Sequence, residues 1–188
     1  EDFQGHEGCN EVLNVSRPDI VASVHSAYLE VGVDLVETNT FGANWANLLE
    51  YGIPERIYEY NLAAARVAKE TANSFSSKDH PRFVIGSMGP GTKLPSLGHT
   101  TFANLRDTFE EQARGLIDGG ADALLIETSQ DLLQTKSAVI GAMRAKKSLG
   151  IDLPVWAQVT VETTGTMLLG SEIGAALTAL APLGIEII

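Results

Sequence analysis

The chain of 188 residues is 44% apolar and 20% charged, and its formal net charge of −11 at pH 7 corresponds to a pI near 4.7. This acidic balance argues against nucleic acid and anionic membranes as partners, and no apolar run is long enough to span a bilayer. The one cysteine, Cys9, excludes an internal disulfide framework and suits a reducing, cytoplasmic location. Because the chain lacks an initial methionine and stops within the apolar residues 185–188, we expect it to be a piece of a longer protein.

The spacing of apolar residues, together with the positions of glycine and proline, predicts the first helices and strands. Residues 1–15 are polar and contain glycine, which predicts a loop. Residues 16–19 resemble a capping box with a proline near the first turn, and Gly32 ends the helix that they begin. The apolar residues of that helix recur on one face: Ile20, Val24, Tyr28 and Val31. A strand at 33–38, a short helix at 44–51 and a longer helix from Pro54 are expected next.

The rest of the chain repeats one order of signals. The apolar run 123–126 follows a pair of glycines, stops on Glu127 and precedes Asp131, which can cap a new helix. Glycine, aspartate, an apolar run and Glu-Thr also follow one another at 32–38. Helices are expected at 102–118, 132–149 and 174–180, the first with Leu105, Phe109, Ala113 and Leu116 inward. Parallel strands are expected at 33–38, 83–87, 123–128, 155–160 and 185–188, in that spatial order.

Strands that alternate with helices at intervals of roughly 30 to 45 residues fit repeated right-handed βαβ units. The spacing allows both a (β/α)8 barrel and a doubly wound sheet. A whole barrel needs about 250 residues. A G-x-G-x-x-G segment follows none of the expected strands, which weakens a dinucleotide-binding interpretation.

The segments that follow the expected strands should carry the chemistry, because ligands bind at the carboxyl ends of parallel strands. These segments offer carboxylates, amides and hydroxyls with few basic groups: 37–41, 87–91, 127–131 and 160–165. This composition suits a small zwitterion or an ammonium group better than a polyphosphate.

Several motifs, taken together and in this order, resemble the homocysteine S-methyltransferase family across the whole chain. They include NEVL at 10–13, ETNTFGAN at 37–44, GSMGP at 86–90, GGAD at 119–122 and IET at 126–128. Three further segments are most similar to the cobalamin-dependent members of the family: GTKLP at 91–95, QDLLQ at 130–134 and TVETTGTMLLGSEIG at 160–174.

The resemblance implies an α/β fold, namely a partial (β/α)8 TIM barrel holding about strands two to six. Residues 1–188 would be one partial homocysteine-binding barrel domain, truncated at both ends. The implied reaction is transfer of a methyl group from methylcobalamin, ultimately from methyltetrahydrofolate, to a zinc-activated homocysteine thiolate to give methionine. The implied partners are homocysteine and the folate- and cobalamin-binding domains of the same parent chain.

The resemblance also implies where zinc binds. The zinc ligands of the family are three cysteines, and in this chain they would lie beyond Ile188. Cys9 matches neither of the family's cysteine motifs, a G-x-N-C segment and an adjacent pair of cysteines, although it is expected on the active-site face. We therefore expect this chain to hold no zinc ligand and no catalytic residue, and to be inactive by itself.

Glu127 matches the family position that holds the homocysteine amino group, and a carboxylate facing an ammonium group is the physical reason. The structural alternative is a strand-end carboxylate that caps the next helix. The role of Glu37, which ends the equivalent earlier strand, is left open.

Two further segments are candidates for the substrate pocket. Asn39, Thr40 and Phe41 could line the pocket wall, or could form a helix-capping turn with a core phenylalanine. Ser87 and Gly89 could offer a hydroxyl and a backbone N–H to a carboxylate, or could form a turn that needs glycine.

Other interpretations stay in view. Lys93 could be the cation of a phosphate-binding loop at 88–93, but the P-loop spacing is absent. The four histidines are dispersed, and His25 is expected to be a packing residue. The chain could also be a catalytically inactive barrel fragment, or part of another TIM-barrel enzyme acting on a small acidic or phosphorylated substrate. A Gly-x-Asn-Cys segment after Ile188 would favour the methyltransferase.

Overall fold

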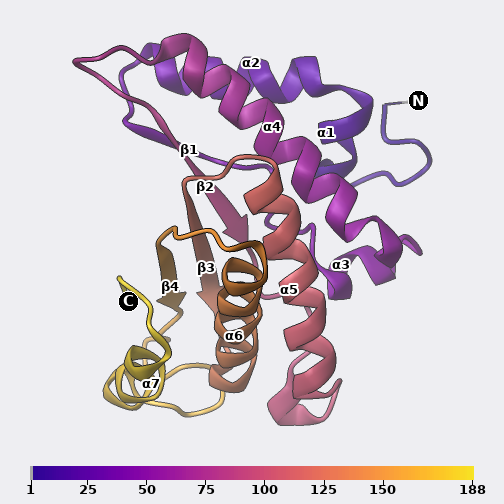
Figure 1. Ribbon diagram of the computed structural model, residues 1–188. Helices are drawn as coiled ribbons and strands as arrows, with labels where there is room; N and C mark the ends of the chain where they lie inside the picture. Colours follow the sequence, from indigo (N-terminus) through magenta and orange to yellow (C-terminus); the bar gives the residue numbers. More distant parts are fainter. Residues whose placement is uncertain (1) are drawn as a thin grey trace.

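In a computed structural model of the protein, which describes residues 2–188, four parallel strands form one sheet in the order β1-β2-β3-β4 (Figure 1). They are β1 (Leu35–Glu37), β2 (Phe83–Met88), β3 (Ala123–Ser129) and β4 (Val155–Val159). Each strand pairs with the next strand along the chain. The direction, order and approximate bounds of the first four predicted strands are therefore confirmed.

The fifth predicted strand is reduced to the beginning of a ladder. Ile187 forms a single parallel bridge with Trp156. Two backbone hydrogen bonds hold this segment beside β4, from Ala157 N to Ile187 O at 2.9 Å and from Glu186 N to Val155 O at 3.1 Å. The prediction that this segment lies parallel to β4 is confirmed. The prediction of a strand over 185–188 is wrong, because a single bridge does not make a strand.

Helices connect the strands. The α-helices are α1 (Leu13–Ser16), α2 (Pro18–Glu30), α3 (Trp45–Glu50), α4 (Ile57–Phe75), α5 (Phe102–Asp118), α6 (Leu132–Leu149) and α7 (Ile173–Leu180). Short 3-10 turns are η1 (Asn10–Val12), η2 (Pro54–Arg56), η3 (Pro95–Leu97) and η4 (Ala181–Leu183). Within residues 2–188 no helix combines the length and the apolar character that a bilayer crossing requires.

The predicted loop over residues 1–15 is wrong for its second half, which forms η1 and α1. Cys9 and Val12 are buried there in a cluster with Leu48, Ile57 and Tyr60. Burial of these two side chains stabilises a helical turn that the polar local composition did not indicate, because tertiary packing overrides local preference.

One face of the sheet packs against the helices. The helix-facing side chains of neighbouring strands include Val36, Val84, Leu124 and Val155, and all four are buried. The predicted inward residues of α5 (Leu105, Phe109, Ala113 and Leu116) are buried in this layer, as expected. The opposite, inner face carries Ile85, Ala123 and Leu125 with Trp156 against them. The inner face leads directly to the candidate site.

The apolar face of α2 differs from expectation. Ile20, Val24, Tyr28 and Val31 do share one side, but Val24 is 51% and Tyr28 60% exposed. The face that packs against the molecule is instead Val21, His25 and Leu29. The predicted inward face of α2 is therefore wrong by one position along the helix. The prediction that His25 is a packing residue agrees with its burial.

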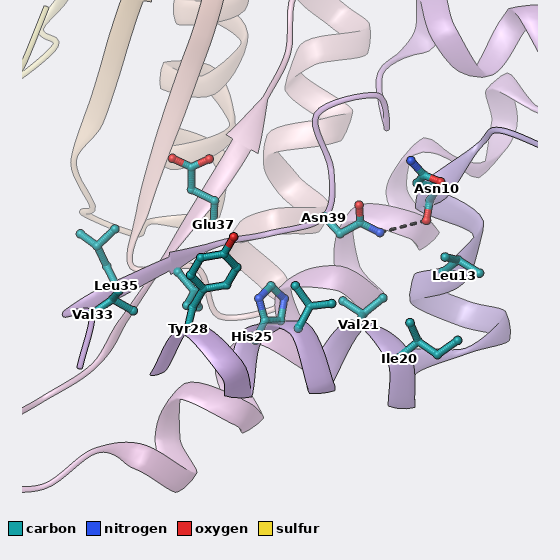
Figure 2. Close-up of a pocket in the computed structure, with 12 residues that line it drawn as sticks. Asn10, Leu13, Ile20, Val21, His25, Tyr28, Val33, Leu35, Glu37 and Asn39 are labelled. Atoms are coloured by element: carbon teal, nitrogen blue, oxygen red, sulfur yellow. Dashed lines mark hydrogen bonds between the residues drawn. The ribbon is translucent and has the colours of Figure 1, made fainter. Parts of the chain in front are cut away.

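A cleft of about 550 Å³ lies between α2 and the edge of β1, and most of the side chains that line it are apolar (Figure 2). Burial lowers the pKa of His25, whose Nε2 has no hydrogen-bond partner among the described residues.

Candidate functional site

The candidate site lies on the inner face, where the strands end at their carboxyl termini. Parallel pairing sets Glu37 opposite Ile85, and Ile85 opposite Ala123. Because side chains alternate along a strand, Glu37, Ser87 and Glu127 all belong to the inner face. Three separate βα units thus contribute one polar side chain each to the same edge of the sheet.

Ser87 and Glu127 form the central contact of this edge. The Ser87 hydroxyl donates a hydrogen bond to Glu127 Oε1, across the β2–β3 pair. Ser87 is 2% exposed, whereas Glu127 is only partly buried. The carboxylate is therefore oriented from below by Ser87 while part of it remains accessible, which is the arrangement that a cationic ligand requires.

Buried threonines hold Ser87 in place. Its N–H donates to Thr38 Oγ1 at 3.0 Å, and its carbonyl accepts from Thr40 Oγ1 at 2.7 Å. The two threonine hydroxyls also share a hydrogen bond of 2.6 Å. Thr40 is completely buried. The structure thus places Thr40 beneath Ser87 rather than on the pocket surface.

A second layer of amides supports the threonines. Gln112 Nε2 from α5 donates to Thr40 O at 3.2 Å and to Asn61 Oδ1 at 3.3 Å. Asn61 Nδ2 donates in turn to Ala43 O at 2.8 Å. Both amide side chains are fully buried, so this network fixes the loop after β1 against two helices.

The hydrogen bonds of Asn39 go to the N-terminal turn and not to Ser87 or Glu127. Its Nδ2 donates to Asn10 O at 2.9 Å, and Asn14 Nδ2 donates to Asn39 O at 2.8 Å. Figure 2 shows Asn39 beside Asn10, on the wall of the cleft along β1, two residues after Glu37 at the end of that strand. Asn39 therefore ties the N-terminal turn to the loop after β1.

Phe41 and Gly89 meet at the contact between two loops. Phe41 is 43% exposed. A Cβ atom on Gly89 would overlap the Phe41 carbonyl oxygen, so only glycine allows the loops after β1 and β2 to approach so closely. Of the six predicted site residues, the structure joins Ser87 directly to Glu127, places Thr40 and Gly89 in supporting positions, and leaves Asn39 and Phe41 on the flanks.

The electrostatics of the edge are acidic. Loss of hydration raises the pKa of Glu37 above its ordinary value, and the Glu127 carboxylate raises it further. The Glu127 charge therefore disfavours ionisation of Glu37, and a bound cation beside Glu37 relieves that repulsion.

Zinc does not fit the residues that the structure describes. Within residues 2–188, His, Cys, Asp and Glu form no group of three or more that could hold a metal ion. Cys9 is buried, and burial together with the nearby Glu11 raises the pKa of its thiol to about 11. A thiolate ligand would have to overcome both effects, so Cys9 is a poor ligand in this fold.

Sequence patterns missed the supporting residues Thr38, Asn61 and Gln112. Gln112 lies three residues after Phe109 and four before Leu116, on the inward face of its helix. A polar amide on a core-facing stripe needs a buried partner. That position was the signal from which the network could have been found.

The homocysteine S-methyltransferase family profile matches residues 1–188. The chain belongs to this family. It is 57% identical over 188 residues to a protein named methionine synthase from Mycobacterium tuberculosis, and 55% identical to one from Mycobacterium leprae. The match covers all of this chain but only 16% of each of those relatives. The chain thus spans about one sixth of their length.

Solved structures of the homocysteine methyltransferase MmuM from Escherichia coli share the fold. The metallated form superimposes with a TM-score of 0.76 at 17% identity, covering 92% of this chain and 62% of that one. The apo form gives a TM-score of 0.70 at the same identity. At this identity the likeness establishes the α/β fold, in which the four-stranded sheet is part of a barrel.

Proposed function

We propose that residues 1–188 form the homocysteine-binding part of a methionine synthase, with Glu127 as the partner of the homocysteine ammonium group. The observation that carries this proposal is the Ser87–Glu127 hydrogen bond at the carboxyl ends of adjacent parallel strands. The similarity to mycobacterial proteins named methionine synthase supports the substrate class.

The chemistry of the edge favours an amino acid as ligand. A partly buried carboxylate binds an ammonium group through charge-assisted hydrogen bonds, which are stronger than neutral ones. Glu37 adds a second negative charge nearby, and Ser87 leaves the outer part of the Glu127 carboxylate free for a ligand. Homocysteine supplies the ammonium group, and its thiol would extend away from Glu127.

The remaining chemistry belongs to residues outside 2–188. Zinc, when bound there, would lower the pKa of the homocysteine thiol and so supply the nucleophile. Methylcobalamin would be the methyl donor, carried with the folate site on other domains of the parent chain. A cytoplasmic location is part of the same proposal.

The test is homocysteine binding to full-length protein carrying Glu127→Ala. Loss of one partner of a partly buried charge pair costs about 2–5 kcal/mol, so we expect binding to weaken by at least about thirtyfold in calorimetry. Zinc content, measured by atomic emission, should stay unchanged because Glu127 is not a proposed ligand. Glu30→Ala, at the exposed end of α2, is the matched control. Unaltered homocysteine affinity in the Glu127 variant would reduce Glu127 to a structural role.

The alternative of a phosphorylated substrate has little support from the site. Lys93, the one candidate cation of the loop 88–93, lies 3.5 Å from the Glu50 carboxylate. The neighbouring inner edge carries Glu37 and Glu127, which repel phosphate. An inactive fragment remains compatible with the proposal, because a homocysteine-binding surface without zinc ligands would not transfer a methyl group.

A further inference from the structure

Strand β3 contains an irregularity directly after the proposed ammonium partner. Leu124, Leu125 and Ile126 pair with consecutive residues of β4, ending at Ala157. The next pair is Ser129 with Val159. Three steps along β3 therefore match two along β4, so that Glu127 and Thr128 together oppose Gln158. This is a β-bulge, which bends a strand and changes the direction of its side chains.

Thr128 has the backbone conformation that forms the bulge. Its φ is +56°, and within residues 2–188 only Gln4 shares a positive φ among non-glycine residues. The left-handed region is unfavourable for a β-branched residue, and glycine is the residue that adopts it without steric cost. Outliers of this type persist only where the surroundings enforce them, and they concentrate at functional sites.

The surroundings enforce the bulge from its far side. Ser129 is buried, and its carbonyl accepts a hydrogen bond from Thr160 N at 2.8 Å. Asp131 then caps α6 by accepting from Leu133 N at 2.8 Å, and it binds the loop after β2 by accepting from Ser96 N at 3.0 Å. With Glu127 bonded to Ser87 on the near side, the extra residue has to be accommodated between two fixed points.

We propose that Thr128 is a positioning residue whose left-handed backbone aims the Glu127 carboxylate at the ammonium group of the substrate. This inference rests on the proposed function. The contribution is made by the backbone, because the Thr128 side chain is exposed and its hydroxyl forms no hydrogen bond with the described residues. Residues that adopt a positive φ readily should therefore replace Thr128, and a residue that cannot adopt it should not.

The variants follow from this distinction. Thr128→Pro fixes φ near −65°, which removes the left-handed conformation, while the extended conformation that proline demands of the preceding residue suits Glu127 in its strand. Thr128→Gly and Thr128→Asn both tolerate a positive φ and both remove the hydroxyl, so they are the matched controls.

The readout compares homocysteine with 4-mercaptobutyrate, which has the thiol and the carboxylate but no amino group. Each full-length variant is assayed for kcat and KM with both thiols. We expect Thr128→Pro to raise the KM for homocysteine by about 10–100-fold with little change for 4-mercaptobutyrate. Thr128→Gly and Thr128→Asn should keep the discrimination between the two thiols within about threefold of the unmodified protein. A merely structural role would affect both thiols equally.

The outcomes separate the two proposals. If Glu127→Ala leaves the discrimination intact, the proposed function fails. If Glu127→Ala abolishes it and Thr128→Pro does not, only the positioning role fails. Discrimination lost in Thr128→Gly would assign the effect to the side chain and would also overturn the inference.

Folding provides a second measurement should Thr128→Pro not fold. Glycine weakens a regular strand, but it relieves a left-handed residue. We therefore expect Thr128→Gly to raise the thermal midpoint of the full-length protein's barrel transition. A lowered midpoint in both Thr128→Gly and Thr128→Asn would contradict the left-handed conformation and the inference with it.

Discussion

Glu37 is a residue whose ionisation depends on burial and on the neighbouring charge of Glu127. Loss of hydration and the Glu127 carboxylate raise the pKa of Glu37 above its ordinary value of 4.5. Just above pH 4.5, Glu37 is therefore partly protonated in the free protein. An ammonium ligand favours the ionised form, so binding must release that proton.

We accordingly expect homocysteine affinity to weaken as the pH falls through the raised pKa of Glu37. Glu37→Gln removes this proton release. The homocysteine affinity of that variant should therefore depend less on pH than the affinity of the unmodified protein. Calorimetry of the full-length protein at a series of pH values from neutral downwards measures the difference. Parallel pH profiles for the two proteins would show that Glu37 does not sense the ligand.

Cys9 is a residue whose chemistry is suppressed by its position. Its Sγ lies 3.5 Å from Glu11 Oε2, and the pKa of the thiol is raised from 9.0 to about 11. At pH 8 the thiolate fraction should be about a hundredfold below that of an unperturbed cysteine. In the 188-residue chain, whose only cysteine is Cys9, we expect alkylation by iodoacetamide to be at least that much slower than in urea.

The same position bears on zinc. We expect the 188-residue chain to retain no stoichiometric zinc after dialysis against a mild chelator. Rapid alkylation of the folded chain, or bound zinc that Cys9→Ala abolishes, would make Cys9 a reactive residue or a ligand.

The position of Glu127 near the carboxyl end of a strand was predictable, because an apolar run that ends on a carboxylate indicates a buried strand leaving the core. The sequence did not predict Thr38 or Gln112, because their importance comes from partners that are distant in the chain. Gln112 and Thr40 are 72 positions apart. A local pattern carries no information about such a contact.

At the scale of elements, two glycines govern how closely the crossover helices pack. A Cβ atom at Gly141 of α6 would lie 2.6 Å from Arg106 O of α5. A Cβ atom at Gly115 of α5 would lie 2.7 Å from Tyr58 O of α4. These helices therefore approach through backbone contact, and side chains larger than hydrogen would separate them.

We expect Gly141→Ala to destabilise the barrel by about 1–3 kcal/mol, because the added methyl group overpacks a backbone contact. Gly174→Ala in α7 is the control, since a Cβ atom there meets nothing within 4 Å. Alanine also favours helix over glycine, so the control should be neutral or stabilising. Thermal unfolding of the full-length protein carrying each variant compares them directly. Equal midpoints would mean that α5 and α6 can separate without cost.

Elements were predictable where apolar runs and glycine stops agreed, as in α5, α6 and the first four strands. The helical turn at α1 could not be predicted in this way. The apolar cluster beside it depends on Ile57 and Tyr60 of α4 and on Ile53 before that helix. The inward face of α2 was misassigned because its exposed side is as apolar as its buried side: Val24 and Tyr28 are exposed, whereas Val21 and Leu29 are buried.

At the scale of the molecule, the sheet has an unpaired edge at β1. Among the described residues, 2–188, strand β1 pairs only with β2, and the apolar side chains of Val31 and Leu35 nearby are 80% and 38% exposed. Open edges beside apolar surface invite pairing with other chains. We expect the isolated 188-residue chain to self-associate at micromolar concentration and to unfold without a sharp transition.

Sedimentation velocity and a calorimetric scan check this expectation. Val31→Lys should reduce the self-association, because a charge on an exposed apolar patch opposes contact between chains. A single monomeric boundary with a cooperative thermal transition would show that the four-stranded sheet is stable with its edge exposed.

The Ser87–Glu127 contact joins residues that are 40 positions apart and lie on opposite sides of α5 in the chain. During synthesis on the ribosome, Glu37 and Ser87 leave the exit tunnel long before Glu127 does. The two threonines below Ser87 can bond to each other and to β2 as soon as that strand emerges. The Glu127 carboxylate follows only after α5 has been made. If Glu127 binds the substrate as proposed, a nascent chain cannot present that carboxylate until β3 has been made, and a stalled chain that ends before β3 should not bind homocysteine.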